Sequence, residues 1–340
     1  MRSAVLARCT VVAVLGWLTS TLTVADDSPS VSVGGLLFGD AYAIPSHHIE
    51  DGQGAVGLVL RRGYLTFDAD ITQRTFGRLR FELNQSGEFE TYTFDADVKD
   101  LYLGWNLGRH QLIAGLTSTI TYDLIESVWG YRHLARTPMD LQGVPSRDNG
   151  LSIKGPLNQA DTLRYRFMLG IRVDMGAETN EAPKVIGALT WKPYPRWTID
   201  LYADYQENSQ QVSGYSYQAF AEYQAEDWRW GAQYAKQDLD ESPPIELISA
   251  FIIKSLSAKT ELVTRVDRLL EPSPKGNDIA YLPVDPSAKA TLFFAGVTVE
   301  LSPHVSLIPN TVITAYDRND QGMRPETDVY LRMTLFINYE

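Results

Sequence analysis

Apolar and polar residues alternate at every second position along most of the chain beyond residue 25. In the segment 164–173, one set of alternate positions holds Tyr, Phe, Leu, Ile and Val, and the other holds Arg, Arg, Met, Gly and Arg. The segments 197–205 and 329–339 repeat this arrangement. Because successive side chains of a strand point to opposite faces, the pattern predicts β-strands with one apolar face and one polar face.

The alternating segments are long and even in number. Strands of globular proteins usually contain about 5–6 residues, whereas tilted strands that cross a bilayer need about 9–11. An even strand number is typical of single-chain bacterial outer-membrane barrels. Sixteen strands are predicted, at 31–44, 55–72, 75–85, 97–107, 109–120, 149–157, 161–174, 184–193, 196–206, 214–225, 227–237, 245–256, 258–269, 289–301, 304–316 and 327–340.

The connections between these segments alternate between brief and long. The brief ones are 72–75, 108, 157–160, 194–195, 226, 257 and 302–303. The long ones are 45–54, 86–96, 121–148, 175–183, 207–213, 238–244, 270–288 and 317–326. Short turns at one end and long loops at the other are the asymmetry of outer-membrane barrels, with the turns in the periplasm and the loops outside the cell.

The alternation alone does not say which face is inside. In a secreted soluble sandwich the apolar faces meet in a core, whereas in a membrane barrel they face lipid. Aromatic residues close to strand ends fit the headgroup level of a membrane, although strands favour aromatics in any setting. Strand length, loop asymmetry and aromatic placement together predict an all-β fold, a transmembrane antiparallel barrel of sixteen strands surrounded by outer-membrane lipid.

The first 25 residues are predicted to be a secretory signal. Arg2 and Arg8 precede an apolar run at 11–18, and small residues at 23–25 offer a cleavage site. The run is too short to cross a bilayer as a helix, which leaves a retained amphipathic anchor as the alternative. Residues 26–340 are then a single barrel domain, exported through the periplasm to the cell outer membrane.

The composition of the mature chain limits its partners. Without the two arginines of the signal, 28 basic and 42 acidic residues remain, a formal net charge of −14. This acidity argues against nucleic acid as a partner. The one cysteine, Cys9, leaves with the signal, so stability must come from packing or from a closed hydrogen-bonded ladder rather than from a disulfide.

The longest connection, 121–148, is predicted to fold into the lumen and to set the narrowest cross-section. Structureless loops above about 12–15 residues are uncommon unless they are functional, and 126–136 has the composition of a short helix. The alternative is a surface loop that closes the mouth of the barrel. The charged residues predicted to line the constriction are Glu126, Arg132, Arg136, Asp140 and Arg147.

Basic residues also form rows on predicted inward faces. Arg78 and Arg80 lie on the third strand, Arg164, Arg166 and Arg172 lie on the seventh, and Arg332 lies on the sixteenth. Such a ladder would attract anions, because charged rings set the selectivity of pores. Inward acids on other strands would oppose it across the lumen. The alternative is that these charges are merely paired with neighbours or solvated.

Several short stretches resemble one known family. They are 99–105 through Gly115, Glu126 with 147–150, 265–269 with Pro272, and 308–310 before 316–317. In these stretches the chain is similar to the phosphate-selective porins of Gram-negative bacteria. The resemblance implies a sixteen-strand barrel with inward-folded loops, often a homotrimer. It implies the passage of small hydrophilic solutes or ions and leaves phosphate itself open.

Other classes of function are weighed against this one. A hydrolase would need a nucleophile and a base within hydrogen-bond reach, and His133 near Ser127 has no surrounding serine motif. His47 and His48 beside Glu50 and Asp51 could ligate a metal, but a solvated loop cluster is favoured. A specific carrier would need a plug. We therefore expect a porin that is not an enzyme and that uses no cofactor and no metal.

Overall fold

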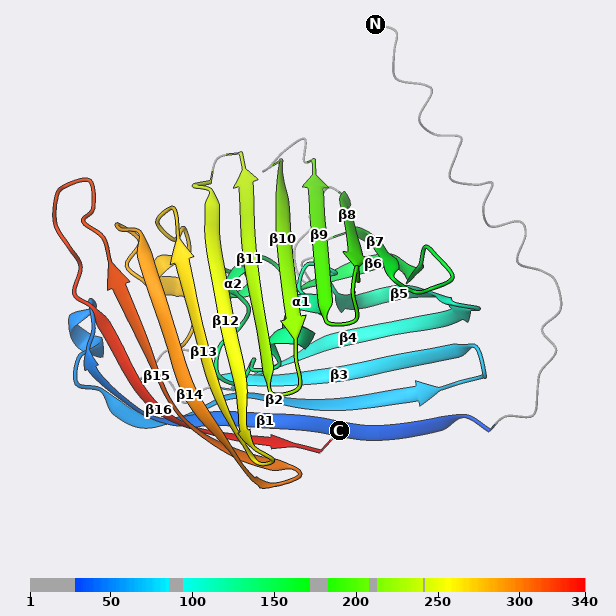
Figure 1. The fold of residues 1–340 in the computed structure, drawn as a ribbon, viewed down its shortest axis with the longest axis horizontal. Helices are drawn as coiled ribbons and strands as arrows, with labels where there is room; N and C mark the ends of the chain where they lie inside the picture. Colours follow the sequence, from blue (N-terminus) through cyan, green and yellow to red (C-terminus); the bar gives the residue numbers. More distant parts are fainter. Residues whose placement is uncertain (1–27, 86–93, 172–182, 208–212, 241, 340) are drawn as a thin grey trace, which may run out of the picture.

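Sixteen antiparallel strands form a closed barrel in the computed structural model of the chain (Figure 1). The structure describes residues 28–85, 94–171, 183–207, 213–240 and 242–339. Each strand pairs with its neighbours in sequence, and β1 pairs with β16 from Leu36 opposite Asn338 to Ser46 opposite Val329. The predicted fold class is confirmed. The predicted signal, residues 1–25, lies outside the described residues, as does Arg172.

The observed strands agree with the predicted ones to within a few residues at most ends. The first eight are β1 Ser30–Ser46, β2 Val56–Asp70, β3 Thr75–Gln85, β4 Phe94–Leu107, β5 His110–Ser118, β6 Arg147–Pro156, β7 Leu163–Ile171 and β8 Pro183–Trp191. The others are β9 Trp197–Gln206, β10 Gly214–Gln224, β11 Trp228–Leu239, β12 Ile245–Ser257, β13 Thr260–Leu269, β14 Ala290–Ser302, β15 Val305–Tyr316 and β16 Asp328–Asn338.

The apolar faces of the alternating strands point out of the barrel. On β9, Leu201 is 55% exposed, whereas Asp200 and Asp204 on the opposite face are buried. On β16, Leu331, Met333 and Leu335 are exposed, and Arg332 and Thr334 between them are buried. An exposed apolar band around a closed ladder is the arrangement that a bilayer requires, because no strand edge is left without hydrogen bonds.

The interior is also apolar along β12 to β15, which the alternation did not predict. The inner faces of β12 to β15 carry buried residues that include Phe251, Val263, Leu292, Phe294 and Ile308. These side chains do not face water, because two connections fold back onto them from inside the barrel. The free lumen is therefore narrower than the ring of strands suggests.

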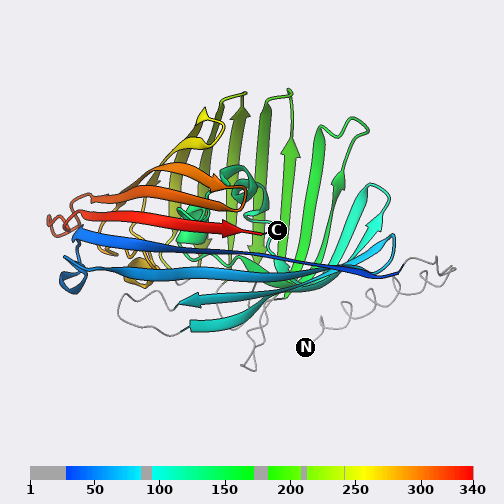
Figure 2. The same ribbon diagram turned by 90° about the horizontal axis from the view of Figure 1, so that it is seen from below.

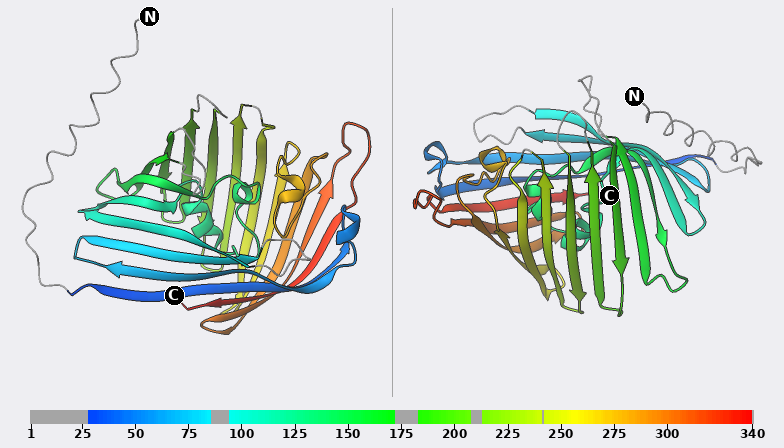
Figure 3. Two further views of the ribbon diagram at one scale, coloured as in Figure 1. Left: turned by 180° about the vertical axis from the view of Figure 1, so that it is seen from behind. Right: turned by 90° about the horizontal axis from the view of Figure 1, so that it is seen from above.

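The first inward connection, called L3 here, comprises residues 119–146 between β5 and β6. It contains α1 Asp123–Trp129 and α2 Pro138–Leu141, which lie inside the ring of strands (Figures 2 and 3). Gly130 ends α1 with a left-handed φ of 69°, a common way to stop a helix and turn the chain. L3 is buried along most of its length, so the prediction of an inward fold agrees with the structure.

The second inward connection, called L7, comprises residues 270–289 between β13 and β14 and includes the short helix η3, Gly276–Asp278. Ile279, Leu282 and Val284 are buried in the same apolar cluster as L3. A third short helix, η2, Glu50–Gly52, lies in the first outward connection. No helix in the described part of the chain is long and apolar enough to cross a membrane.

Candidate pore constriction

L3 is fixed to the barrel wall at its start by hydrogen bonds of Thr121 and by an aromatic contact of Trp129, and Gln218 of β10 donates to the Thr121 carbonyl at 3.3 Å. The Thr121 hydroxyl lies 2.8 Å from the Tyr202 hydroxyl on β9. The Trp129 ring packs edge-on against Phe251 of β12, with 5.2 Å between ring centroids. The Trp129 indole N–H donates to the Ala135 carbonyl at 2.8 Å, which closes the turn after α1. These contacts hold α1 against β9 to β12.

Beyond α1, L3 crosses the lumen to the opposite wall. The Tyr131 hydroxyl donates to the Glu261 carboxylate of β13. The Arg61 guanidinium of β2 donates to the His133 carbonyl. The His133 ring stacks on Phe336 of β16 with centroids 4.1 Å apart. Since β9 lies across the barrel from β2 and β16, L3 divides the interior of the barrel.

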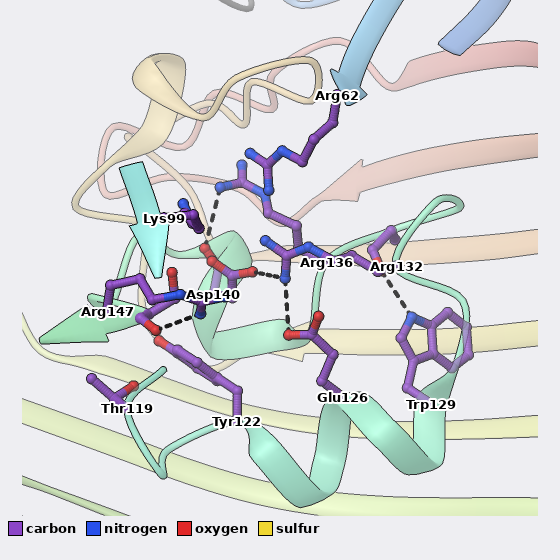
Figure 4. Close-up of polar contacts among 12 residues, drawn as sticks. Arg62, Lys99, Thr119, Tyr122, Glu126, Trp129, Arg132, Arg136, Asp140 and Arg147 are labelled. Atoms are coloured by element: carbon purple, nitrogen blue, oxygen red, sulfur yellow. Dashed lines mark hydrogen bonds and ion pairs between the residues drawn. The ribbon is translucent and has the colours of Figure 1, made fainter. Parts of the chain in front are cut away.

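The face of L3 that is turned away from the apolar cluster carries its charges. Arg132 Nη1 lies 2.7 Å from an Asp140 oxygen and 3.0 Å from a Glu126 oxygen (Figure 4). Arg136 Nη1 donates to the Asp140 carbonyl at 3.4 Å. Although burial opposes its ionisation, the guanidiniums of Arg132 and Arg136 hold the pKa of Asp140 below its ordinary value.

Charged side chains of the barrel wall lie beside this face of L3. Glu82 of β3 accepts from Lys99 at 3.2 Å and lies 3.6 Å from Arg62. Asp100 of β4 lies 2.9 Å from Arg147 Nε. Figure 4 shows Arg62, Lys99 and Arg147 grouped around Asp140. The wall and L3 together therefore form one polar region, which we call the constriction cluster.

Counted over the described residues and their ion pairs, the constriction cluster carries an excess of positive charge. Its eight cationic residues are Arg61, Arg62, Arg80, Lys99, Arg132, Arg136, Arg147 and Arg332. Their ion-pair partners among the described residues are five carboxylates, Asp40, Glu82, Asp100, Glu126 and Asp140. Arg136 and Arg332 have no ion-pair partner in the described part of the chain. This excess stands out in a chain with a formal net charge of −12.

The predicted basic rows on β3 and β7 are paired with local carboxylates. Arg78 lies 2.6 Å from Asp68. Arg166 lies 2.7 Å from Asp200, and Arg80 lies 3.6 Å from Asp100. Arg164 is half-exposed and pairs with an aspartate of the neighbouring turn. On these two strands the arginines are paired with neighbouring carboxylates, which is the alternative considered in the sequence analysis. The excess positive charge lies on L3 and on the wall beside it.

Two cavities lie on either side of L3. One has a volume of about 800 Å³ and is lined by Tyr131, Glu261 and residues of the β12–β13 turn, so it opens toward the short turns. The other has a volume of about 60 Å³ and lies between L3, L7 and the β1–β2–β16 wall. Arg61, Arg62 and Arg332 reach it from the wall.

The candidate hydrolase residues are not brought together. The Ser127 hydroxyl donates to the Leu124 carbonyl at 2.7 Å. Burial, together with the positive charge of Arg61, lowers the pKa of His133 to about 3, so its imidazole is neutral at ordinary pH. A neutral imidazole stacked on Phe336 has the role of a packing group rather than that of a base poised near neutral pH.

His47 and His48 meet a different carboxylate from those weighed in the sequence. Both approach Asp328 at the start of β16, and their ligand atoms lie close enough together to hold a metal ion. Each histidine is already engaged, since His47 Nε2 lies 2.8 Å from the Tyr330 hydroxyl and His48 Nε2 lies 2.9 Å from Asn277 Oδ1. We interpret the group as a hydrogen-bond network that joins three outward connections.

Two β-bulges explain the cluster residues that the sequence pattern missed. The β1–β2 register shifts at Arg61, and the β3–β4 register shifts at Lys99. A bulge places an extra residue on one strand, so consecutive residues can face the same side. Arg61 and Arg62 thus both enter the lumen, as do Lys99 and Asp100. Consecutive charged residues inside an otherwise alternating segment are the signal that could have revealed them.

The fold has clear counterparts among solved structures, while no family model and no curated protein matches the sequence. An anion-selective porin from Comamonas acidovorans has 14% sequence identity and a TM-score of 0.64, over 92% of this chain and 100% of that one. OmpF of Salmonella typhi, solved with daunomycin, has 13% identity and a TM-score of 0.66, over 92% and 99%. OmpT of Vibrio cholerae, an outer-membrane protein solved in a trimer form, has 13% identity and a TM-score of 0.59, over 92% and 100%. At these identities the likeness concerns the fold.

Proposed function

We propose that this chain is an outer-membrane porin, a channel for passive diffusion of small hydrophilic solutes, with a preference for anions. The fold supports the channel, because a closed barrel with an apolar outer band and a polar inner region suits a bilayer. The excess positive charge of the constriction cluster carries the preference. In a confined space that excludes much of the water, such charge raises the local concentration of anions.

The position of L3 makes this charge effective. A solute that passes from one side of L3 to the other must move along its polar face, because the opposite face packs on β12 to β15. Arg132 and Arg136 lie on that polar face, and Arg62 faces them from the wall. Each anion therefore passes within reach of several guanidiniums, which are strong donors to anionic oxygens.

The resemblance to phosphate-selective porins and the likeness in fold to the anion-selective porin both favour a preference for anions. Phosphate is one candidate solute among small anions. In keeping with the trimer form of the Vibrio cholerae protein, we also propose that three copies associate within the outer membrane. The absence of a nucleophile–base pair at Ser127 and His133 supports passive transport over hydrolysis.

The test is the reversal potential of the purified protein in a planar bilayer under a gradient of potassium chloride. An anion preference predicts a potential with the sign of chloride permeation, reduced in Arg136→Gln. Arg78→Gln is the matched control, because that arginine lies in the lumen wall outside the constriction cluster and is paired with Asp68. A potential with the sign of potassium permeation in the unmodified protein would contradict the proposal.

A further inference from the structure

The smaller cavity, about 60 Å³ between L3, L7 and the wall, is unusual in its lining. Five arginines reach it, Arg61, Arg62, Arg132, Arg136 and Arg332, and no carboxylate lines it among the described residues. Asp40, Glu82 and Asp140, the ion-pair partners of Arg61, Arg62 and Arg132, are not among the residues that line it. Its volume is several times the space that a water molecule needs, which leaves room for a solute of a few non-hydrogen atoms.

Two of these arginines retain donors for a ligand. Arg332 gives Nη2 to the Tyr281 carbonyl at 2.7 Å, and its guanidinium stacks over the Tyr330 ring. Arg136 gives Nη1 to the Asp140 carbonyl. A guanidinium has five N–H donors, so each keeps several for an anion. Burial lowers the pKa of Arg136, and although Asp140 opposes this shift, repulsion from Arg62 and Arg132 adds to it. A bound anion would relieve the repulsion between these guanidiniums.

The rest of the lining is apolar. Leu134 and Leu141 of L3 face the cavity from one side, and Leu282 of L7 and Phe38 of β1 face it from the others. A purely inorganic anion would place a hydrated charge against these apolar side chains and would make no apolar contact with them. A ligand that fits has an oxyanion at one end and a short hydrocarbon part at the other.

L7 is held over the cavity by a residue with a strained backbone. Tyr281 has a φ of 65°, a left-handed conformation that side chains other than glycine rarely adopt. Its hydroxyl donates to the Gln85 carbonyl at 2.6 Å, and its own carbonyl accepts from Arg332. Strained residues that persist in a fold often have a functional reason, and here the hydrogen bond to the Tyr281 carbonyl fixes the position of Arg332.

We propose that this cavity is a binding site for a short-chain monocarboxylate, beside the path of general diffusion. The carboxylate is held by Arg332 and Arg136, and the hydrocarbon part contacts Leu134, Leu141 and Leu282. The proposal rests on the proposed anion channel for access and adds to it a saturable site with a preference for one class of anion.

The test is a calorimetric titration of the purified full-length protein in detergent micelles with sodium propionate. Saturable binding is expected, weakened about tenfold or more in Arg332→Gln and in Arg136→Gln, because each removes a charge-assisted hydrogen bond. Arg78→Gln, outside the cavity, should bind propionate as the unmodified protein does. Retained heat-modifiable gel mobility shows that each variant is folded.

A second measurement needs no variant. Affinity should rise about fourfold per added carbon from formate to propionate, as each methylene enters apolar surroundings, and fall for benzoate, which exceeds the cavity. Equal affinities along this series would overturn the proposal, as would tighter binding of inorganic phosphate than of propionate. A chloride-selective reversal potential without saturable propionate binding would disprove the binding site and still support the anion channel. Saturable propionate binding without a chloride-selective potential would support the binding site and disprove the anion preference of the channel.

Discussion

His48 Nδ1 lies 2.9 Å from both carboxylate oxygens of Asp328, which joins the first outward connection to the start of the last strand. The Tyr316 hydroxyl also donates to Asp328, and His48 Nε2 reaches Asn277 of L7. With both ring nitrogens facing oxygen atoms, His48 fits this place best as an imidazolium. The network joins the connections that surround the outer mouth of the barrel.

This arrangement predicts a pH-dependent stabilisation. Burial opposes the charge on His48, but Asp328, Asn277 and Asp285 outweigh it and raise the pKa of His48. A raised folded pKa means that the stabilisation is complete below the unfolded value of about 6.5 and is lost as pH rises through the folded value. His48→Gln should therefore lower the melting temperature at pH 5 by a few degrees, on the order expected for about 1 kcal/mol.

Thermal unfolding in detergent between pH 5 and 9 measures this effect. The gap between the unmodified protein and His48→Gln should close toward high pH. His304→Gln is the control, because that histidine lies in the β14–β15 turn and contacts a backbone carbonyl, at Asn338, rather than a carboxylate. A gap that stays constant over the whole range would rule out the imidazolium.

Trp129 is predicted to determine how firmly L3 blocks the lumen. Its side chain is 1% exposed, packs on Phe251 and lies under the Arg265 guanidinium at 4.9 Å. Trp129→Ala should cost about 3–5 kcal/mol if the cavity stays open. Because L3 would lose its main contact with the wall, single-channel conductance should also rise. Both quantities are measurable on the same purified preparation.

Trp228→Ala is the matched control for the previous substitution. Trp228 is 43% exposed on the outer face of β11, beside Lys254, so its loss should change neither conductance nor stability to a comparable degree. Unchanged conductance in Trp129→Ala, in a variant that remains folded, would show that α1 does not need this anchor.

Gly130 should be intolerant of a side chain for a conformational reason. Its φ of 69° ends α1 in the left-handed region, and only the flexible end of Arg229 lies near the place that an added methyl group would occupy, at 3.3 Å. The expected cost of Gly130→Ala is therefore the strain of the left-handed conformation, about 1–2 kcal/mol. Gly187→Ala on β8 has open space and should leave the melting temperature unchanged; an equal decrease in both variants would argue against strain.

The barrel was predictable from the sequence because its pattern is local. A strand that faces lipid on one side and water on the other must alternate, and Leu201 with Asp200 shows this alternation at adjacent positions. The inward fold of L3 was predictable from its length and mixed composition. The apolar inner faces of β12 to β15 were not, since they depend on which distant segments cover them.

The constriction cluster was only partly predictable for the same reason. Once the sequence indicated that L3 folds inward, its charged residues Arg132, Arg136 and Asp140 could be assigned to the constriction. Arg61 and Lys99 could not, because they enter the lumen at bulges that shift the alternation by one residue. The basic rows on β3 and β7 were visible in the sequence, but their neutralisation by Asp68 and Asp200 depends on pairing across strands.

Glu82 and Arg136 should tune selectivity in opposite directions. Glu82→Gln removes the carboxylate shared by Lys99 and Arg62, and Arg136→Gln removes a cation that has no ion-pair partner among the described residues. One unit charge at about 4 Å in water-like surroundings is worth about 1 kcal/mol, or roughly a fivefold change in local ion concentration. The chloride-to-potassium permeability ratio should rise by up to this factor in Glu82→Gln and fall by it in Arg136→Gln.

Both substitutions replace a charged group by a neutral amide, so a change in pore size alone would move the permeability ratio little in either variant. The two effects should also weaken together at high ionic strength, because at 1 M salt charges are screened beyond about 3 Å. If Glu82→Gln and Arg136→Gln shifted the ratio in the same direction, the charge of the constriction cluster would not control permeation, and selectivity would have to arise elsewhere along the lumen.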